Sequence, residues 1–365
     1  MAQVRNLTPF SVELLVFPDA SGQEISLLVI SACFTEDSSG LLAPWMSQPP
    51  VRVADEHFGD PASSSIRHEA DVALCKPFVD VIVNGSVHAP NGEPTVSVVV
   101  ELHVADLHKK LRVQGDRKRS WLLLGAVSPF RRPFQRMPII YERAFGGTDS
   151  RSSNPKRHKT YRWNPVGTGF RRQLAKLPGI DSDGPNIADI GARYGFARKS
   201  PAGFGVIGRS WPPRINYAGT YDAKWLKNQW PLLPADFDPR YNQCAPEDQQ
   251  SRTILGGEEV RLVNLTPEGE WRFRLPKLDV PIHLFYDDRQ VEASPRLDTV
   301  IMEPDLRCVM LSARLAIPVE RARPPLREIV LGHVSKGWLR AKFKRKRYRD
   351  PLGTDGAISH QANYK

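Results

Sequence analysis

Cysteine is scarce in this sequence, and the few cysteines lie far apart. The four thiols are Cys33, Cys75, Cys244 and Cys308, and no two of them form a C-x-x-C pair. This spacing excludes the common zinc signatures and the dense framework of a small disulfide-rich domain. We therefore expect buried free thiols in a protein of a reducing compartment.

Long hydrophobic runs are missing as well. A membrane-spanning helix needs about 20 predominantly apolar residues, and no such run occurs in the chain. The N-terminal stretch MAQVRNLTPFSVELLVF lacks the charged segment and long apolar segment of a secretory signal. We expect a soluble, cytoplasmic protein that does not insert into a membrane.

Recognisable catalytic and cofactor motifs are also absent. The chain contains neither H-E-x-x-H nor G-x-S-x-G. GFGVIG at residues 203–208 matches the letters of the dinucleotide pattern, but SPAG before it and RSWPPR after it do not supply the required strand and helix. His103 and His108 are interpreted as parts of a solvated sheet face. The sequence thus predicts no cofactor, no metal ion and no catalytic residue.

Proline and glycine, in contrast, are abundant, at 32 and 26 residues. Because proline breaks helix interiors, this composition favours strands and turns. Apolar and polar residues alternate in TVSVVVELHV (95–104) and EWRFRL (270–275), as in half-buried strands. Further strands are expected near 12–17, 25–34, 79–83, 280–286, 297–303 and 306–317. The predicted fold is mainly β, with antiparallel sandwich or meander units, long irregular loops and a few short helices.

These patterns divide the chain into four ranges. They are an N-terminal β-rich unit, a loop-rich Gly/Pro/aromatic region packed on the β units, a second β-rich unit and a basic C-terminal extension. Their bounds are 1–128, 129–254, 255–320 and 321–365. Asn84-Gly85 predicts a tight hairpin turn. Helices are expected at 220–228, capped by Thr220, and at 325–341.

Two stretches suggest functions of different classes. Asp236, Asp238 and Asp248 are carboxylates that a hydrolase would use for acid/base work, although capping and turn formation explain them more simply. KGWLRAKFKRKRYR, residues 336–349, carries eight Lys or Arg and no acid, in a chain of net charge +11. Such a tail is an alternative site for nucleic acid, or a solvated arm for an acidic partner.

The chain contains five ordered motifs: KPFVDVIVNGSVHAPNGEP (76–94), RMPIIYERAFGGTD (136–149), NPVGTGF (164–170), PAGFGVIGRSW (201–211) and AGTYDAKWLKNQWPLLPADFDPRYNQCAPEDQ (218–249). Together they resemble one bacterial family of unknown function that is found in type VI secretion gene clusters. The resemblance covers about residues 5–315. It implies an adaptor chaperone that loads an effector toxin onto the VgrG spike or its tip protein. The basic C-terminal extension and Tyr241-Asn242 depart from the family pattern.

The resemblance marks candidate structural or partner-binding residues rather than catalytic ones. They are Arg143, Phe145, Gly146, Gly147, Asn164, Pro165, Gly167, Gly219, Thr220, Tyr221, Asp222, Trp225, Pro234, Asp236, Phe237, Asp248 and Gln249. The paired glycines of AFGGTD are expected to serve packing. The aromatic stretch 217–238 is expected mainly to form a buried structural knot between the two β units, with part of its surface facing a partner.

Overall fold

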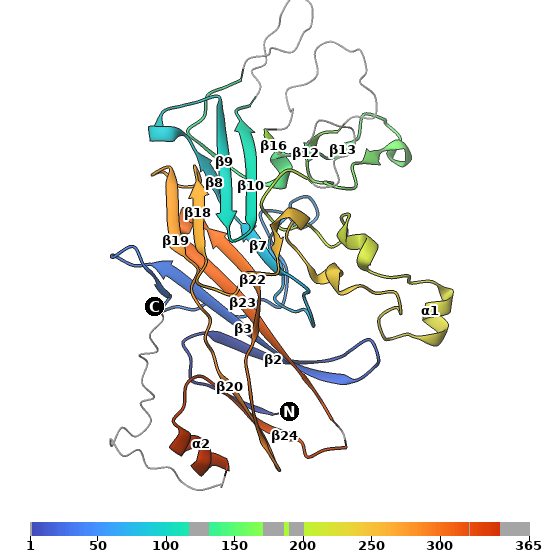
Figure 1. Ribbon diagram of the computed structural model, residues 1–365. Helices are drawn as coiled ribbons and strands as arrows, with labels where there is room; N and C mark the ends of the chain where they lie inside the picture. Colours follow the sequence, from blue (N-terminus) through green and yellow to red (C-terminus); the bar gives the residue numbers. More distant parts are fainter. Residues whose placement is uncertain (1, 117–130, 171–185, 190–200, 321, 344–365) are drawn as a thin grey trace, which may run out of the picture.

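The computed structural model describes residues 2–116, 131–170, 186–189, 201–320 and 322–343. Its largest sheet has the order β17-β7-β22-β23-β3-β2, and β4 pairs with β3 (Figure 1). The strands are β17 (Gln250–Ser251), β7 (Val79–Val83), β22 (Arg296–Glu303), β23 (Cys308–Pro318), β3 (Glu24–Glu36), β2 (Ser11–Pro18) and β4 (Leu42–Pro44). Neighbouring strands are antiparallel except β7 and β22, which are parallel.

A second sheet, of five strands, has the order β16-β10-β9-β18-β19 and is antiparallel. Its strands are β16 (Ile187–Asp189), β10 (Leu107–Gln114), β9 (Ser97–Val104), β18 (Glu259–Val263) and β19 (Glu270–Arg274). The predicted alternation is confirmed, because Leu102 and Val104 are buried on one face of β9 while Glu101 and His103 lie on the other. Trp271 and Phe273 are likewise buried, with exposed arginines between and after them.

A third sheet joins the two ends of the described chain in the order β1-β24-β20-β21. Its strands are β1 (Gln3–Asn6), β24 (Leu326–Leu331), β20 (Ile282–Tyr286) and β21 (Gln290–Ala293). Two-stranded pairs complete the β structure: β5 (Glu56–His57) with β6 (Ile66–His68), β8 (Ser86–His88) with β11 (Arg136–Pro138), β12 (Phe145–Gly146) with β15 (Thr168–Gly169), and β13 (Thr148–Asp149) with β14 (Lys159–Thr160).

Helices are few and short in the described residues. They are α1 (Ala223–Asn228), α2 (Lys336–Phe343) and the 3₁₀ turns η1 (Pro90–Gly92), η2 (Tyr141–Arg143), η3 (Pro155–Arg157), η4 (Arg214–Tyr217), η5 (Pro239–Asn242), η6 (Glu247–Gln249) and η7 (Pro304–Leu306). No helix within the described part of the chain is long and apolar enough to cross a membrane. The prediction of a mainly β fold with long connections and few helices is confirmed.

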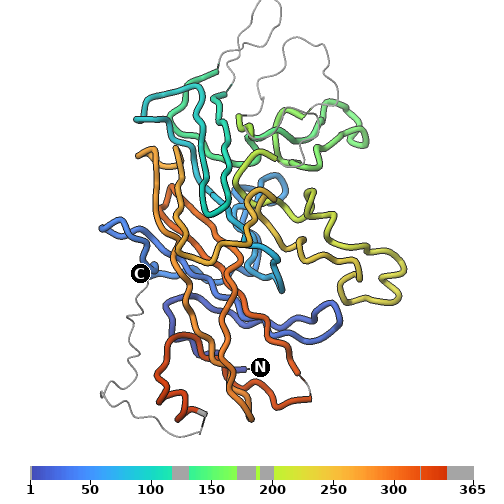
Figure 2. Tube along the Cα trace, viewed as in Figure 1, coloured from blue at the N-terminus to red at the C-terminus, as the bar shows by residue number. Residues whose placement is uncertain are grey.

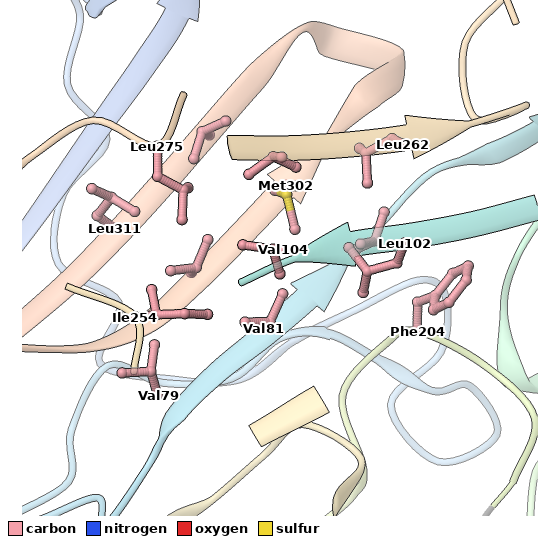
Figure 3. Packing of buried hydrophobic residues seen from close by; sticks show 14 of the residues in the cluster. Val79, Val81, Leu102, Val104, Phe204, Ile254, Leu262, Leu275, Met302 and Leu311 are labelled. Atoms are coloured by element: carbon pink, nitrogen blue, oxygen red, sulfur yellow. The ribbon is translucent and has the colours of Figure 1, made fainter. Parts of the chain in front are cut away.

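The core lies between the largest sheet and the five-stranded sheet. Figure 3 shows Leu102, Val104 and Leu262 beside Val81 and Met302, and all five side chains are almost completely buried. Burying a side chain of this size contributes roughly 1.5 to 3 kcal/mol. Pairing crosses the predicted ranges 1–128 and 255–320, because β9 pairs with β18 and β3 pairs with β23.

Three local predictions were wrong. Asn84-Gly85 does not close a hairpin, because β7 and β8 lie in different sheets; a Cβ at residue 85 would come within 2.7 Å of Pro304. The helix predicted for 325–341 is instead β24 followed by α2. The apolar residues 329–331 are buried in a sheet, and Gly332, with a φ of +109°, ends the strand directly after them. Cys75 is exposed, whereas the other three cysteines are buried free thiols as expected.

Candidate functional site

Residues 217–238 form a lobe that closes on itself at its base. The backbone N–H of Asp238 donates to the carbonyl of Tyr217 at 3.0 Å. Asp236 accepts hydrogen bonds from the Thr220 amide at 2.9 Å and from the Thr220 hydroxyl at 2.7 Å. Gly219 has a φ of +82°, and a Cβ there would come within 2.8 Å of Pro234. These contacts fix the neck of the lobe.

Inside the lobe, α1 is organised around Trp225. The carboxylate of Asp222 caps α1 by accepting from the Trp225 amide at 2.8 Å, and the indole N–H of Trp225 donates to the Leu232 carbonyl at 2.9 Å. Asp222 therefore performs the capping role that the sequence assigned to Thr220, whose hydroxyl is taken by Asp236. The ring of Tyr221 lies edge-on to Trp225 with centroids 4.7 Å apart.

The apolar side chains of the lobe point largely into solvent. Tyr221 is 54% exposed, Leu226 is 62% exposed and Trp230 is 65% exposed. Figures 1 and 2 show that α1 projects away from the three sheets, with the turn between β2 and β3 below it. The prediction of a buried knot between β units was wrong, because the cap and the internal backbone bonds let this segment fold on itself while leaving three large apolar groups outside.

A pocket of about 240 Å³ lies beside the neck. Its wall includes Phe78, Ile207, Tyr217, Arg240 and Glu247. The guanidinium of Arg240 lies over the Tyr217 ring at 4.3 Å, so an aromatic and a cationic group line one side of it. Phe237 packs edge-on against Tyr241, with centroids 5.9 Å apart, on the returning segment of the neck.

The three aspartates considered for acid/base chemistry each have a structural partner. Hydrogen bonds from Thr220 lower the pKa of Asp236. Asp238 accepts from the Arg240 amide and guanidinium, both at 2.9 Å, and these bonds lower its pKa. Asp248 pairs with the Lys109 ammonium at 2.8 Å. Because a lowered pKa keeps a carboxyl ionised at neutral pH, Asp236 and Asp238 are poor general acids. The hydrolase hypothesis gains no support from these partners.

Gly146, Gly147, Asn164 and Gly167 form a tight crossing of two backbone segments. A Cβ at Gly146 would come within 2.1 Å of the Asn164 carbonyl oxygen, and one at Gly147 within 2.2 Å of the Gly167 carbonyl. The buried amide of Asn164 donates to the Tyr141 carbonyl at 2.9 Å and to the Phe145 carbonyl at 3.1 Å. The glycines therefore allow the close approach that packing requires.

Three predicted residues lie around this crossing. The Phe145 ring packs edge-on against Tyr161, with centroids 5.2 Å apart. Arg143 pairs with Asp116 at 3.3 Å, and Pro165 is half-buried next to Asn164. None of these three residues exposes a large apolar group as Trp230 does. We therefore interpret them as part of the scaffold.

Asp248 and Gln249 connect the two larger sheets. The buried Gln249 side chain donates to the carbonyls of Val81 and Phe204 at 2.7 and 2.9 Å, and it accepts from the Lys109 ammonium at 2.9 Å. Burial lowers the pKa of Lys109, and Asp248 opposes this effect. Phe204 belongs to the GFGVIG segment, which is buried and packs on Tyr141. The segment is therefore part of the core, in agreement with rejecting a nucleotide loop there.

The described part of the basic stretch is α2. Its Trp338 ring lies 5.6 Å from the guanidinium of Arg5, and Lys342 pairs with Glu328 of β24 at 2.6 Å. This portion of the predicted arm packs on the third sheet. Residues 344–349 lie outside the described residues, and the nucleic-acid hypothesis remains a prediction.

Two features of the site were missed at the level of sequence. Leu226 was not among the candidates, although a short helix with apolar residues on more than one side cannot bury them all against one sheet. The buried pair of Lys76 and Asp80 was missed entirely. The spacing of four residues did not indicate that the pair is buried, because residues 243–245, which donate hydrogen bonds to Asp80, are far away in the sequence.

A family model described as "Uncharacterized protein conserved in bacteria (DUF2169)" matches residues 21–314. Comparisons with curated proteins and with solved structures gave no match. The matched range contains the exposed lobe, the glycine crossing and most strands of the two larger sheets, and it ends before β24 and α2. The description names no function, so the role in type VI secretion stays a prediction.

Proposed function

For this chain, which belongs to the DUF2169 family of bacterial proteins, we propose a function in protein binding, as a non-enzymatic adaptor that holds a partner on its exposed aromatic lobe. The observation that carries the proposal is the set of three large apolar side chains, Tyr221, Leu226 and Trp230, which are each more than half exposed on one lobe. Several large apolar groups left in solvent on one projecting element make that element a candidate interaction site.

The lobe has the physical properties of a docking element. Trp and Tyr are enriched among the residues that dominate binding free energy, since they bury large rigid surfaces. The Asp222 cap and the bonds between Thr220 and Asp236 hold the lobe in one conformation before a partner arrives. Preorganisation of this kind reduces the entropy lost on binding.

The surroundings of the lobe favour an amphipathic partner segment. Lys224 and Lys227 are exposed on the same short helix as Leu226. The pocket beside the neck, at about 240 Å³, offers space for a side chain between Phe78 and Tyr217. A segment with apolar residues flanked by acidic ones would complement both features, with charge pairing contributing mainly to specificity and association rate.

The partners proposed on the resemblance to type VI secretion adaptors are an effector toxin and the VgrG spike or its tip protein. In this role the chain binds the effector in the cytoplasm, shields an unstable or membrane-seeking segment of it, and presents it to the spike. The β scaffold supplies a rigid body, and the lobe supplies the contact. The chain itself makes and breaks no covalent bond in this scheme.

A co-purification experiment tests the proposal. The tagged chain is expressed with the effector and the spike protein encoded beside it, and retention of each is measured. In the variant Tyr221→Ala/Leu226→Ala/Trp230→Ala we expect retention to be lost, because removal of a hot-spot aromatic costs about 2 kcal/mol or more, a roughly thirtyfold weaker Kd.

The matched control is Leu255→Ala/Leu306→Ala, which removes apolar groups that are 79% and 61% exposed elsewhere on the surface. We expect this control to retain both partners. Failure of the wild-type chain to retain either protein contradicts the adaptor role. Equal retention by the lobe variant and the control contradicts the assignment of the lobe as the contact.

A further inference from the structure

The outer face of the five-stranded sheet carries a cluster of two imidazoles and a carboxylate. His103 of β9 and His108 of β10 are directly opposite in the strand register, and their rings stack with centroids 4.0 Å apart. Glu101 lies two residues before His103 on the same face. One donor atom from each of the three side chains lies within 4.8 Å of the others.

The donor atoms of the three side chains lie close together. Oε2 of Glu101 is 2.7 Å from Nε2 of His103 and 3.7 Å from Nε2 of His108. Around a tetrahedral ion with bonds of about 2.0 to 2.1 Å, neighbouring ligand atoms are separated by roughly 3.3 Å. The two separations, 2.7 and 3.7 Å, bracket this value. The rings reach it by rotation about χ2, a torsion that is soft for histidine.

The backbone beneath the cluster is held in place. β9 and β10 are joined at Ala105 and Asp106, and Ala105 has a φ of +49°. The Asp106 carboxylate accepts from the hydroxyls of Ser251 and Thr253 at 2.7 and 2.9 Å. A tight, anchored turn fixes the register that places His103 opposite His108, and sites on such rigid elements hold their geometry best.

We propose that Glu101, His103 and His108 bind a divalent transition-metal ion of the zinc type on the outer face of this sheet. Imidazole nitrogen and carboxylate oxygen together suit zinc and its neighbours in the first transition row. Three protein ligands leave a coordination position for water or for a group from another molecule.

Neighbouring charges shape this site. The Lys110 ammonium lies 2.7 Å from Oε1 of Glu101, so it orients the carboxylate while Oε2 faces both imidazoles. Arg261 is opposite His103 on β18, but its guanidinium pairs with Glu270. A partner that orients a ligating carboxylate in this way is usual around metal sites.

The test uses the chain carrying Cys75→Ser, because an exposed thiol such as that of Cys75 can bind zinc by itself. After treatment with a chelator and its removal, zinc chloride is titrated by calorimetry, and the thermal midpoint is measured with and without zinc. We expect saturable binding to a single site and a midpoint that rises with zinc concentration. His103→Ala and His108→Ala should weaken binding about tenfold or more, and Glu101→Gln should also weaken it.

His333→Ala is the matched control, because His333 is an exposed histidine on a different part of the surface. It should bind zinc as the parent does. His103→Gln replaces His103→Ala if the alanine variant does not give the circular-dichroism spectrum of the parent. Absence of saturable zinc binding in the parent overturns the site, as does binding that His103 and His108 substitutions leave unchanged.

Discussion

The buried ion pair of Lys76 and Asp80 provides a stringent test of how the scaffold is held together. The Lys76 ammonium lies 2.8 Å from the Asp80 carboxylate, and both side chains are buried. Asp80 also accepts from the Gln243 amide at 2.7 Å and from the backbone amides of Cys244 and Ala245 at 2.9 and 3.1 Å. Gln243 and Ala245 line the pocket beside the lobe, so this carboxylate connects β7 to the candidate site.

Removal of one partner leaves a buried charge without its counter-charge. Breaking such a pair costs about 3 to 5 kcal/mol, and total stabilities are about 5 to 15 kcal/mol. We therefore expect Asp80→Ala to lower the free energy of unfolding by about 3 to 5 kcal/mol, since it removes the partner of Lys76 and the acceptor of two backbone amides. Lys76→Met should also destabilise the chain, because it leaves the carboxylate buried without its cation.

The assay is urea unfolding monitored by fluorescence. A shift of the midpoint reports a change in stability when the slope of the free energy of unfolding against urea concentration stays constant. The informative variant is Lys76→Met/Asp80→Asn, which removes both charges and keeps one acceptor oxygen for a backbone amide. Its loss of stability should be smaller than the sum of Lys76→Met and Asp80→Asn by about 0.5 to 3 kcal/mol. A cost below about 1 kcal/mol for Asp80→Ala, or strict additivity in the cycle, would refute this reasoning.

Three further predictions concern packing, pH and thiol accessibility. Gly203→Ala places a Cβ within 2.4 Å of the Tyr141 ring and should cost about 1 to 3 kcal/mol, whereas Gly205→Ala, with its Cβ 3.6 Å from the same ring, should cost less; urea midpoints compare them. Burial raises the pKa of Glu303, but the hydrogen bond from His68 and the charge of Arg67 outweigh it, so the folded pKa lies below the ordinary value of 4.5. The ionised Glu303 carboxylate therefore stabilises the fold fully above pH 4.5, and this stabilisation is lost as the pH falls through the folded pKa. The free energy of unfolding, measured at a series of acidic pH values, checks this expectation. Glu303→Gln should flatten the dependence on pH. A thiol reagent should label Cys75 rapidly in the native chain and the buried cysteines only after unfolding, and Cys75→Ser should remove the fast phase; fast labelling that persists in Cys75→Ser contradicts the burial of the others.

The strands were the most predictable part of this protein. In β9 and β19 the alternation of apolar and polar side chains fixes which residues are buried, because a strand turns successive side chains to opposite faces. The partners of each strand were not predictable in the same way. β7 and β9 are close in sequence but lie in different sheets, and β3 pairs with β23 across most of the chain.

The helices and the lobe show the same limit. Leu326, Ile329 and Val330 fit a helical stripe by spacing, yet they form β24 because this segment pairs with β1 on one side and with β20 on the other. Tyr221, Trp225 and Trp230 were expected to be buried because aromatic residues usually are. Only the folded chain shows that Trp225 has a partner inside the lobe while Trp230 remains in solvent.

The sequence by itself determined that this protein is mainly β, since local alternation and the abundance of proline and glycine act within a few residues of each position. It also determined the resemblance on which the adaptor hypothesis rests. Tertiary structure alone decided the order of strands, the exposure of the lobe and the proximity of Glu101, His103 and His108. These features depend on which distant segments meet, and pairing between distant segments is selected by the packing of the whole chain rather than by the residues on either side of a position.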